Sequence, residues 1–343
     1  MPGAEPRRIV HAVRSDGFAG VERYVALLAA EQARRGHRVT VIGGGQAAMA
    51  ATVAGVGVRL HPAVTTPQVV RHLNTLADAD VLHVHMTAAE AAAVLAVRAW
   101  RVPVVATRHF AARRGRGLGG RLMAPLIRRR LAVQIAISDY VAAHIDGASV
   151  VVRSGVPIVE EEAGERDRTI LLAQRLEPEK GGADAVRAFA ASGLLGEGWS
   201  LLVAGDGAQR PALERLAGAL GVAGGVRFLG QRGDVGELML RAGVLIAPCP
   251  IEGLGLTALE AMAAGLPVVA AGAGGHLETV GRVSDAALYA PGDAAAAAAQ
   301  LRRLAQDADL RRDYGERLRA VQRRDFTVER QADAVEDVYR RLW

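Results

Sequence analysis

Short apolar runs alternate with longer amphipathic segments along the whole chain. The first apolar run, at residues 7–13, precedes a segment at 21–36 whose apolar residues recur with helical spacing and which ends at Gly36. Further runs that predict strands lie at 37–44, 57–62, 79–85, 102–109, 132–138, 148–155, 169–175, 199–207, 225–230, 243–249, 266–272 and 286–292. Short Val- and Ile-rich runs separated by helical segments are typical of parallel sheets that carry helices on both faces. We therefore predict an α/β fold.

The alternation breaks once, at the polar and acidic residues 158–168, and a chain of 343 residues exceeds the usual size of one core. We predict two Rossmann-like, doubly wound domains joined by a linker, and a C-terminal helix that returns toward the N-terminal domain. The predicted boundaries are 1–157, 158–168 for the linker, 169–325, and 326–343 for the helix. Because open α/β sheets bind ligands at the carboxyl ends of their strands, we expect the site in a cleft between facing domains.

Composition excludes several classes of protein. The excess of 42 Lys and Arg over 36 Asp and Glu is small, and aromatic residues make up only 4%, so we predict no nucleic-acid partner. The single cysteine, Cys249, excludes an intrachain disulfide and a cysteine-based zinc site. No apolar run reaches the roughly 18 residues of a membrane span, and the N-terminus lacks a signal-peptide pattern. We expect a cytoplasmic protein.

Candidate site residues in the first half follow predicted strands. Gly20 precedes a helix, where backbone N–H groups can approach an anion, although a plain turn explains it equally well. His109 ends the run at 102–109 and has either a binding or a structural role. We interpret His83 and His85 as side chains on opposite faces of their strand, a spacing that suits neither a chelate nor a dyad. We therefore predict no metal site.

Charged and glycine residues follow the strands of the second half. Arg175 and Lys180 lie close to one helix start, which indicates either a phosphate site or a solvated charged turn. Gly205 forms a weaker glycine turn. In the segment PIEGLGLTALE, Glu252 ends a strand and Glu260 follows among apolar helix residues. Burial of the second carboxylate would be costly unless it is hydrogen-bonded, and a ribose diol could supply the donors; the alternative is an exposed helical glutamate.

Together these motifs resemble the retaining glycosyltransferases of the GT-B fold, family-4 type, whose mark is a Glu, seven residues and a second Glu. The resemblance extends over nearly the whole chain. It implies a nucleotide-sugar donor held mainly by the second domain, with Arg175 and Lys180 at the pyrophosphate and Glu260 at the ribose. It places Glu252 at the donor sugar. The remaining donor-side residues that it implies are Gly20, Gly205, Gln231, Gly253, Leu254, Gly255 and Leu256.

The same resemblance gives catalytic roles to Glu252, His109, Lys180 and Arg175, and it implies no cofactor and no essential metal. Two departures stand out: Ala19 precedes Gly20 where many relatives have two glycines, and Leu254 stands where Phe is frequent. The implied reaction is sugar transfer to a hydroxyl with retention, in cell-envelope or natural-product glycoside biosynthesis. A sugar-nucleotide epimerase, a phosphorylase and a non-catalytic nucleotide-sugar-binding protein remain as alternatives.

The acceptor side rests on an arginine-rich segment after His109. Arg113, Arg114 and Arg116 are the acceptor-side candidates. The segment is interpreted as a contact for an anionic or lipid-linked acceptor, as a peripheral contact with acidic lipids at the inner face of the membrane, or as a solvated basic loop. The sequence makes no prediction of oligomeric state.

Overall fold

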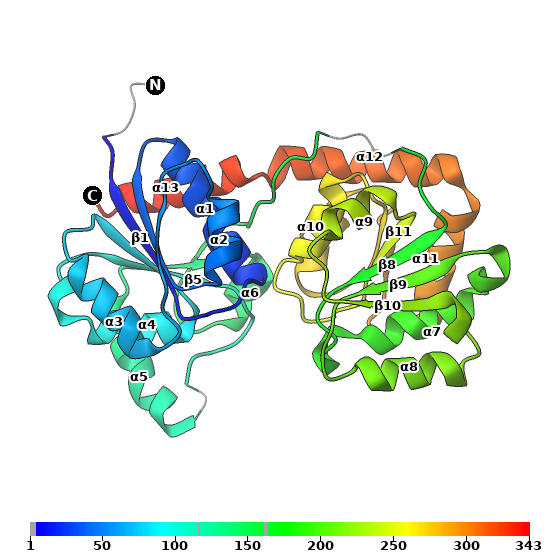
Figure 1. Ribbon diagram of the computed structural model, residues 1–343, viewed down its shortest axis with the longest axis horizontal. Helices are drawn as coiled ribbons and strands as arrows, with labels where there is room; N and C mark the ends of the chain where they lie inside the picture. The colour runs from blue at the N-terminus through cyan, green and yellow to red at the C-terminus, as the bar shows by residue number, and fades with distance from the viewer. Residues whose placement is uncertain (1–4, 116, 161–163) are drawn as a thin grey trace. The chain divides into compact units, whose positions relative to one another are not determined.

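The computed structural model describes residues 5–115, 117–160 and 164–343. It divides into two compact units (Figure 1). Unit 1 comprises the described residues up to Gly155 together with Val328–Trp343, and unit 2 comprises the described part of Val156–Thr327. The predicted linker, 158–168, therefore falls within unit 2, and its residues 161–163 lie outside the described part of the chain.

Unit 1 is built on a seven-stranded parallel sheet of order β3-β2-β1-β4-β5-β6-β7. Its strands are β1 (Arg8–Val13), β2 (Arg38–Ile42), β3 (Arg59–His61), β4 (Val81–His85), β5 (Val104–Arg108), β6 (Val133–Ala136) and β7 (Val150–Val151). Its helices are α1 (Gly20–Arg34), α2 (Gln46–Thr52), α3 (Thr66–Thr75), α4 (Met86–Leu95), α5 (Gly117–Arg130), α6 (Asp139–His144) and, from the end of the chain, α13 (Val328–Arg340). Helices α1 and α13 cover one face of the sheet, and α3 and α4 cover the other (Figure 1).

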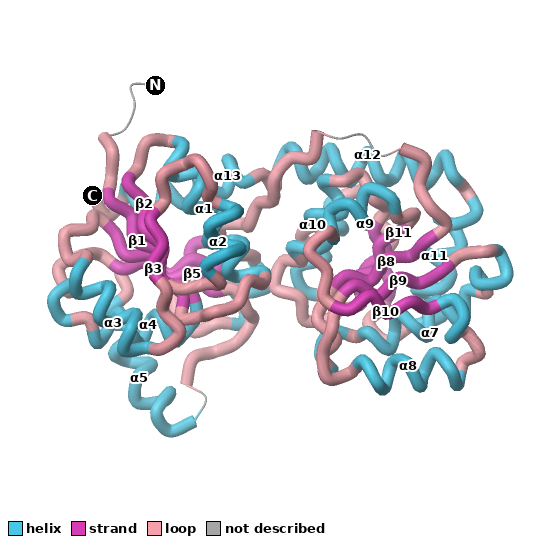
Figure 2. The backbone as a smooth tube through the Cα atoms, in the orientation of Figure 1, coloured by secondary structure: helices cyan, strands magenta, loops and turns pink. Residues whose placement is uncertain are grey.

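Unit 2 is built on a six-stranded parallel sheet of order β10-β9-β8-β11-β12-β13 (Figure 2). Its strands are β8 (Thr169–Ala173), β9 (Ser200–Ala204), β10 (Val226–Gly230), β11 (Val244–Ala247), β12 (Val268–Ala271) and β13 (Leu288–Tyr289). Its helices are α7 (Gly182–Ser192), α8 (Arg210–Ala219), α9 (Val235–Arg241), α10 (Leu256–Ala263), α11 (Ala294–Gln306) and α12 (Ala308–Asp325). Helices lie on both faces of this sheet as well (Figure 1).

The two sheets share one strand order. In each unit the first strand lies centrally, the next two strands extend one edge, and the fourth strand starts the other edge. This is the doubly wound Rossmann-like order, so the predicted fold class is confirmed. The order reverses between β1 and β4 in unit 1 and between β8 and β11 in unit 2. Ligands of such sheets bind outside the carboxyl ends of the strands at this switch point, which directs attention to the loops after these four strands.

The C-terminal helix belongs to unit 1, as the sequence predicts. Helix α13 packs against α1, and its Tyr339 is fully buried with its hydroxyl 2.6 Å from Nδ1 of His83 on β4. Burial on both faces explains why the strands read as apolar runs; β5, for example, is buried along its whole length. Within the described residues, no helix is long and apolar enough to cross a bilayer.

Candidate functional site

An ion pair marks the switch point of unit 2. The loop after β8 leads into a 3₁₀ turn at Pro178–Lys180, and the segment after β11 carries Glu252. Nζ of Lys180 lies 2.7 Å from Oε2 of Glu252, although 72 residues separate the two in sequence. Burial is the largest single influence and opposes the charge of each group. The partner's charge and hydrogen bond, together with smaller nearby influences, outweigh it, so the pKa of Lys180 is raised and that of Glu252 is lowered. Both groups are therefore charged at neutral pH.

Glycine geometry brings the backbone of the same segment close to its neighbours. Gly255 precedes α10 with a φ of +92°, which L side chains rarely adopt, and a Cβ there would lie 3.0 Å from Cδ2 of His276. A Cβ on Gly275 would overlap Cα of Leu254. The buried backbone of 253–255 thus leads directly into the helix, whose first N–H groups lack intrahelical partners. Together with the dipole of α10, these groups favour an anion at this position.

His276 lies beside this candidate site, and sequence reasoning missed it. It is 2% exposed, and its Nδ1 lies 3.2 Å from the carbonyl oxygen of Ala271. Burial lowers the pKa of His276 despite the opposing influence of Glu252. A neutral ring that donates from Nδ1 has an unprotonated Nε2, which lies beside Gly255. The only sequence signal was the pair of glycines before it, because nothing in the pattern links β12 to the segment after β11.

The other predicted donor-side residues of unit 2 have varied surroundings. The side chain of Arg175 is 60% exposed and lies 3.5 Å from Glu179, and its charge slightly offsets the rise in the pKa of nearby Lys180. Glu260 is half-buried in the second turn of α10. A Cβ on Gly205 would overlap the carbonyl oxygen of Gln174, so the fold alone requires this glycine. The remaining members are buried Leu254, half-buried Leu256 and exposed Gln231.

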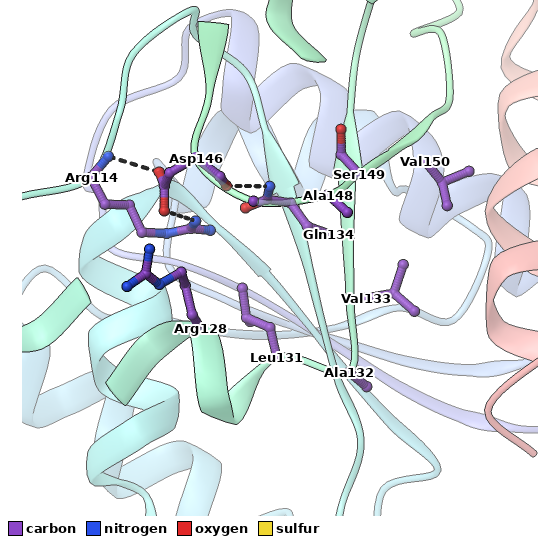
Figure 3. A pocket seen from close by; sticks show the side chains of 11 residues that line it. Arg114, Arg128, Leu131, Ala132, Val133, Gln134, Asp146, Ala148, Ser149 and Val150 are labelled. Atoms are coloured by element: carbon purple, nitrogen blue, oxygen red, sulfur yellow. Dashed lines mark hydrogen bonds and ion pairs between the residues drawn. The ribbon is translucent and has the colours of Figure 1, made fainter. Parts of the chain in front are cut away.

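In unit 1, a pocket of about 350 Å³ lies beside β6 and the loop before β7 (Figure 3). Arg114 forms one wall, and its guanidinium binds Asp146 at 3.0 Å and Glu90 at 2.5 and 2.8 Å. Burial raises the pKa of Asp146, but Arg114 outweighs it and holds that pKa at about 2. These contacts occupy Nε, Nη1 and Nη2 of Arg114 within the fold. As an acceptor contact, Arg114 remains a prediction without separate support.

A second pocket of unit 1, of about 290 Å³, lies at the carboxyl ends of β4 and β5. Its lining includes Met86, Thr87, Thr107, His109, Phe110 and Arg113. The Phe110 side chain is 52% exposed, and Arg113 is exposed as well. Arg116 lies outside the described residues. Gly20, at the start of α1, is exposed, and Glu22 caps this start by accepting a hydrogen bond from the N–H of Ala19 at 3.0 Å.

Met86 at the mouth of this second pocket has a φ of +71°. A left-handed conformation costs a side chain other than glycine about 1–2 kcal/mol, and such strain is concentrated at functional sites. The strained turn directs the chain from β4 into α4 beside His109. The pocket therefore combines strained backbone, a buried histidine and an exposed cation, Arg113, at the switch-point edge of unit 1.

The interpretation of His83 and His85 as side chains on opposite faces is wrong. Residues two apart on a strand point to the same face, and the two rings stack with centroids 4.4 Å apart. With His11 of β1 they form a buried cluster in which one nitrogen from each ring lies within 4.8 Å of the others, a spacing that could hold a metal ion. However, all six ring nitrogens already have hydrogen-bond partners: Gln32, Tyr339, Thr107, His109 and one another. Hydrogen bonding therefore accounts for the cluster without a metal.

Comparison with known proteins gives matches along nearly the whole chain. Residues 18–156 match the family model described as Glycosyltransferase Family 4, and residues 158–321 match the model described as Glycosyl transferases group 1. A stretch of 135 residues is 38% identical to the 2-deoxystreptamine glucosyltransferase of Streptomyces kanamyceticus, over 39% of this chain and 35% of that protein. A stretch of 189 residues is 38% identical to the D-inositol 3-phosphate glycosyltransferase of Salinispora tropica, over 51% of this chain and 38% of that protein. The matches thus span little more than a third of each relative's length.

Solved structures match over the full length. The structure of Anabaena Alr3699/HepE in complex with UDP-glucose has a TM-score of 0.80 at 20% identity, covering 97% of this chain and 99% of that one. AviGT4, a glycosyltransferase involved in avilamycin A biosynthesis, has a TM-score of 0.71 at 20% identity, covering 98% of both chains. At this identity the likeness shows a shared fold.

Proposed function

Because the chain belongs to the family-4-type glycosyltransferases of the GT-B fold, we propose that it transfers a sugar from a nucleoside-diphosphate donor to an acceptor hydroxyl with retention of the anomeric configuration. The observation that carries the proposal is the Lys180–Glu252 pair beside the backbone that begins α10. A cation, a carboxylate and the N–H groups of a helix start at one switch point are the groups that a sugar diphosphate requires. Independence of metals and a cytoplasmic location are parts of the same proposal.

The donor diphosphate binds at Lys180 and Arg175 in this proposal. Lys180 keeps its proton because Glu252 raises its pKa, so it meets the phosphates as a full positive charge. The exposed Arg175 adds a second charge from the same loop. Glu260, half-buried on α10, accepts from the ribose hydroxyls, and Glu252 accepts from hydroxyls of the sugar. The solved complex of Alr3699/HepE with UDP-glucose supports a donor of this class.

The composition of the chain singles out Lys180. It is the only lysine in the sequence, since the other 41 of the 42 basic residues are arginines. An arginine would spread its charge over a planar fork, whereas an ammonium group is a compact point charge with three donors. That geometry lets one side chain bond Glu252 and a phosphate oxygen at the same time. Because the chain uses arginine at every other basic position, a lysine here favours a functional role for this side chain.

The proposed reaction breaks the bond between the anomeric carbon and the β-phosphate oxygen and forms a bond from the acceptor oxygen to that carbon on the same face. The acceptor proton passes to the departing phosphate, so no protein base is required. Lys180, Arg175 and the N–H groups at the start of α10 stabilise the leaving diphosphate. Glu252 orients the sugar and balances positive charge at the anomeric carbon; we assign it no covalent role.

We place the acceptor in the pocket at the carboxyl ends of β4 and β5. Thr87, Thr107 and His109 offer hydrogen bonds to a polyol, and exposed Arg113 offers a charge to a phosphate or other anion. Relatives named for 2-deoxystreptamine and D-inositol 3-phosphate support a small cyclic polyol as the acceptor class. Contact of the arginine-rich segment with acidic lipids remains a separate proposal.

The single lysine makes a direct test available. Reductive methylation with ¹³C-formaldehyde keeps the charge and labels only Lys180 and the terminal amine. We expect the Lys180 signal to titrate above the ordinary lysine value, to shift with one of the UDP-, GDP-, ADP- or dTDP-sugars, and to lose its raised pKa in Glu252→Gln. An unchanged signal with every donor would refute the donor site. Donor incubated alone distinguishes an epimerase, because only that enzyme would isomerise the sugar.

A further inference from the structure

A chain of buried hydrogen bonds runs from α1 to the acceptor pocket. Oε1 of Gln32 lies 2.7 Å from Nε2 of His11, Nδ1 of His11 lies 3.1 Å from Nε2 of His85, and Nδ1 of His85 lies 3.2 Å from Nε2 of His109. Gln32 lies on α1, His11 on β1 and His85 on β4, His109 directly follows β5, and none of the four is more than 8% exposed. His109, the last member, lines the pocket, and its Nδ1 has no hydrogen-bond partner among the described residues.

All three imidazoles of the chain are neutral at physiological pH. Burial lowers the pKa of His11 to about 4, and burial together with the nearby charge of Arg108 lowers that of His109 to about 3. Burial also lowers the pKa of His85 well below the ordinary histidine value. A neutral imidazole has one N–H donor and one bare nitrogen acceptor. Each ring in the chain must therefore accept on one side and donate on the other.

Because each neutral ring donates once and accepts once, Gln32 determines which atom donates in every hydrogen bond of the series. The amide oxygen of Gln32 only accepts, so His11 carries its proton on Nε2 and accepts at Nδ1. His85 then donates from Nε2 and accepts at Nδ1, and His109 donates from Nε2. Nδ1 of His109 is left bare at the pocket. We propose that Gln32, acting through His11 and His85, sets the tautomer of His109 and makes its Nδ1 a hydrogen-bond acceptor for a substrate hydroxyl.

His83 packs against this series of hydrogen bonds but is not part of it. Its ring stacks on His85, and it hydrogen-bonds Tyr339 of α13 and Thr107 of β5, each at 2.6 Å. Those two hydroxyls can donate or accept, so they impose no direction on His83. Among the described residues that hydrogen-bond to His11, His85 or His109, only Gln32 contributes an atom, its amide oxygen, that can accept but never donate. Gln32, His11 and His85 act as positioning residues, because only His109 reaches the pocket.

The tautomer can be observed directly by long-range ¹H–¹⁵N NMR on protein labelled at the histidine rings. His109→Asn assigns the His109 signals. In the wild type we expect one His109 tautomer, protonated on Nε2. Gln32→Met removes the fixed acceptor with little change of shape, and His11→Leu breaks the chain. Both should populate the Nδ1-protonated form to a comparable extent. His11→Asn, whose Oδ1 takes the place of the accepting Nδ1, should restore the wild-type pattern.

Two results would overturn the inference. One is a wild-type His109 protonated on Nδ1. The other is a His109 tautomer that stays the same in a Gln32→Met or His11→Leu variant whose tryptophan fluorescence shows it to be folded. The inference rests on the proposed function only in naming a substrate hydroxyl as the group that Nδ1 meets. The spectra require no substrate. If the tautomer follows Gln32 but no sugar is transferred, the proposed function fails and the assignment of the chain stands.

Discussion

Unit 1 should be sensitive to mild acid because of its buried histidines. His11 and His109 have pKa values of about 4 and about 3 in the folded state, far below the ordinary value of 6.5. The unfolded chain therefore binds protons between pH 6.5 and those values, whereas the folded chain does not. Stability rises with pH wherever the unfolded state binds more protons. The effect is absent above about pH 7.5 and grows as the pH falls below 6.5.

The loss can be worked out for a shift from pH 7.5 to pH 5.5. At pH 5.5 an unfolded histidine is about nine-tenths protonated while folded His11 and His109 remain neutral, so each costs about 1.3 kcal/mol of unfolding free energy. The two together cost about 3 kcal/mol, a large part of the 5–15 kcal/mol that stabilises a typical domain. His83 and His85, whose pKa values burial also lowers well below the ordinary value, add to the loss in the same direction.

The assay is urea unfolding followed by tryptophan fluorescence in a Trp199→Phe background, which leaves Trp100 and Trp343 of unit 1 as reporters. His11→Asn should lose about 1.3 kcal/mol less than its parent between the two pH values, because one titrating group is gone. His144→Asn, at an exposed position of α6, is the matched control and should lose as much as the parent. Equal losses in His11→Asn and the control would refute the reasoning.

Three further outcomes follow from the contacts of single residues. Gly255→Ala should destabilise unit 2 by about 1–2 kcal/mol in urea unfolding, because of its φ of +92° and the His276 ring, whereas Gly218→Ala in α8, with open space around it, should be neutral or slightly stabilising. Arg114→Met removes the guanidinium that binds the buried carboxylate of Glu90 and should lower the unfolding free energy of unit 1 by about 3–5 kcal/mol. Adding Glu90→Gln should recover part of that loss, and no recovery would contradict the ion-pair account. Met86→Gly should raise the unfolding free energy of unit 1 by up to about 1 kcal/mol and should lower transfer if the strained turn shapes the pocket, so unaltered kinetics would remove the turn from the site.

The fold could be predicted because its signal is local and repeated. Each strand is a short apolar run, and each helix carries its own period, so the alternation indicates a parallel sheet without knowledge of any contact. The boundary between the units was harder to place. The polar segment 158–168 marks a change of composition, but the structural division falls at Gly155, where the chain first pairs with the segment near Thr327. Such a long-range contact leaves no periodic trace in the sequence.

The sequence names Lys180 and Glu252 as separate candidates but does not show that they form a pair. Lys180 and Glu252 each follow a strand, which identifies them as candidates, yet the sequence does not show that β8 and β11 are neighbours. Only the strand order makes their loops adjacent and brings Nζ within 2.7 Å of Oε2. His276 follows β12, one strand further along, and reaches the same segment through Gly255. Adjacency of strands, not the identity of residues, was the missing information.

The hydrogen-bonded histidines of unit 1 were even harder to predict, because their contacts also depend on which strands are neighbours. Even with His83 and His85 assigned to one face, a sequence pattern could not have supplied His11 and His109, because the strand order of unit 1 places β1 and β5 on either side of β4. Once that order is known, the register places His11 beside His83 and His85 beside Thr107, two residues before His109, so the rings come close enough to stack or hydrogen-bond. The switch point of unit 2 thus carries paired charges, suited to a charged diphosphate. The switch point of unit 1 carries neutral imidazoles, whose one-donor, one-acceptor rule suits the orientation of an uncharged hydroxyl.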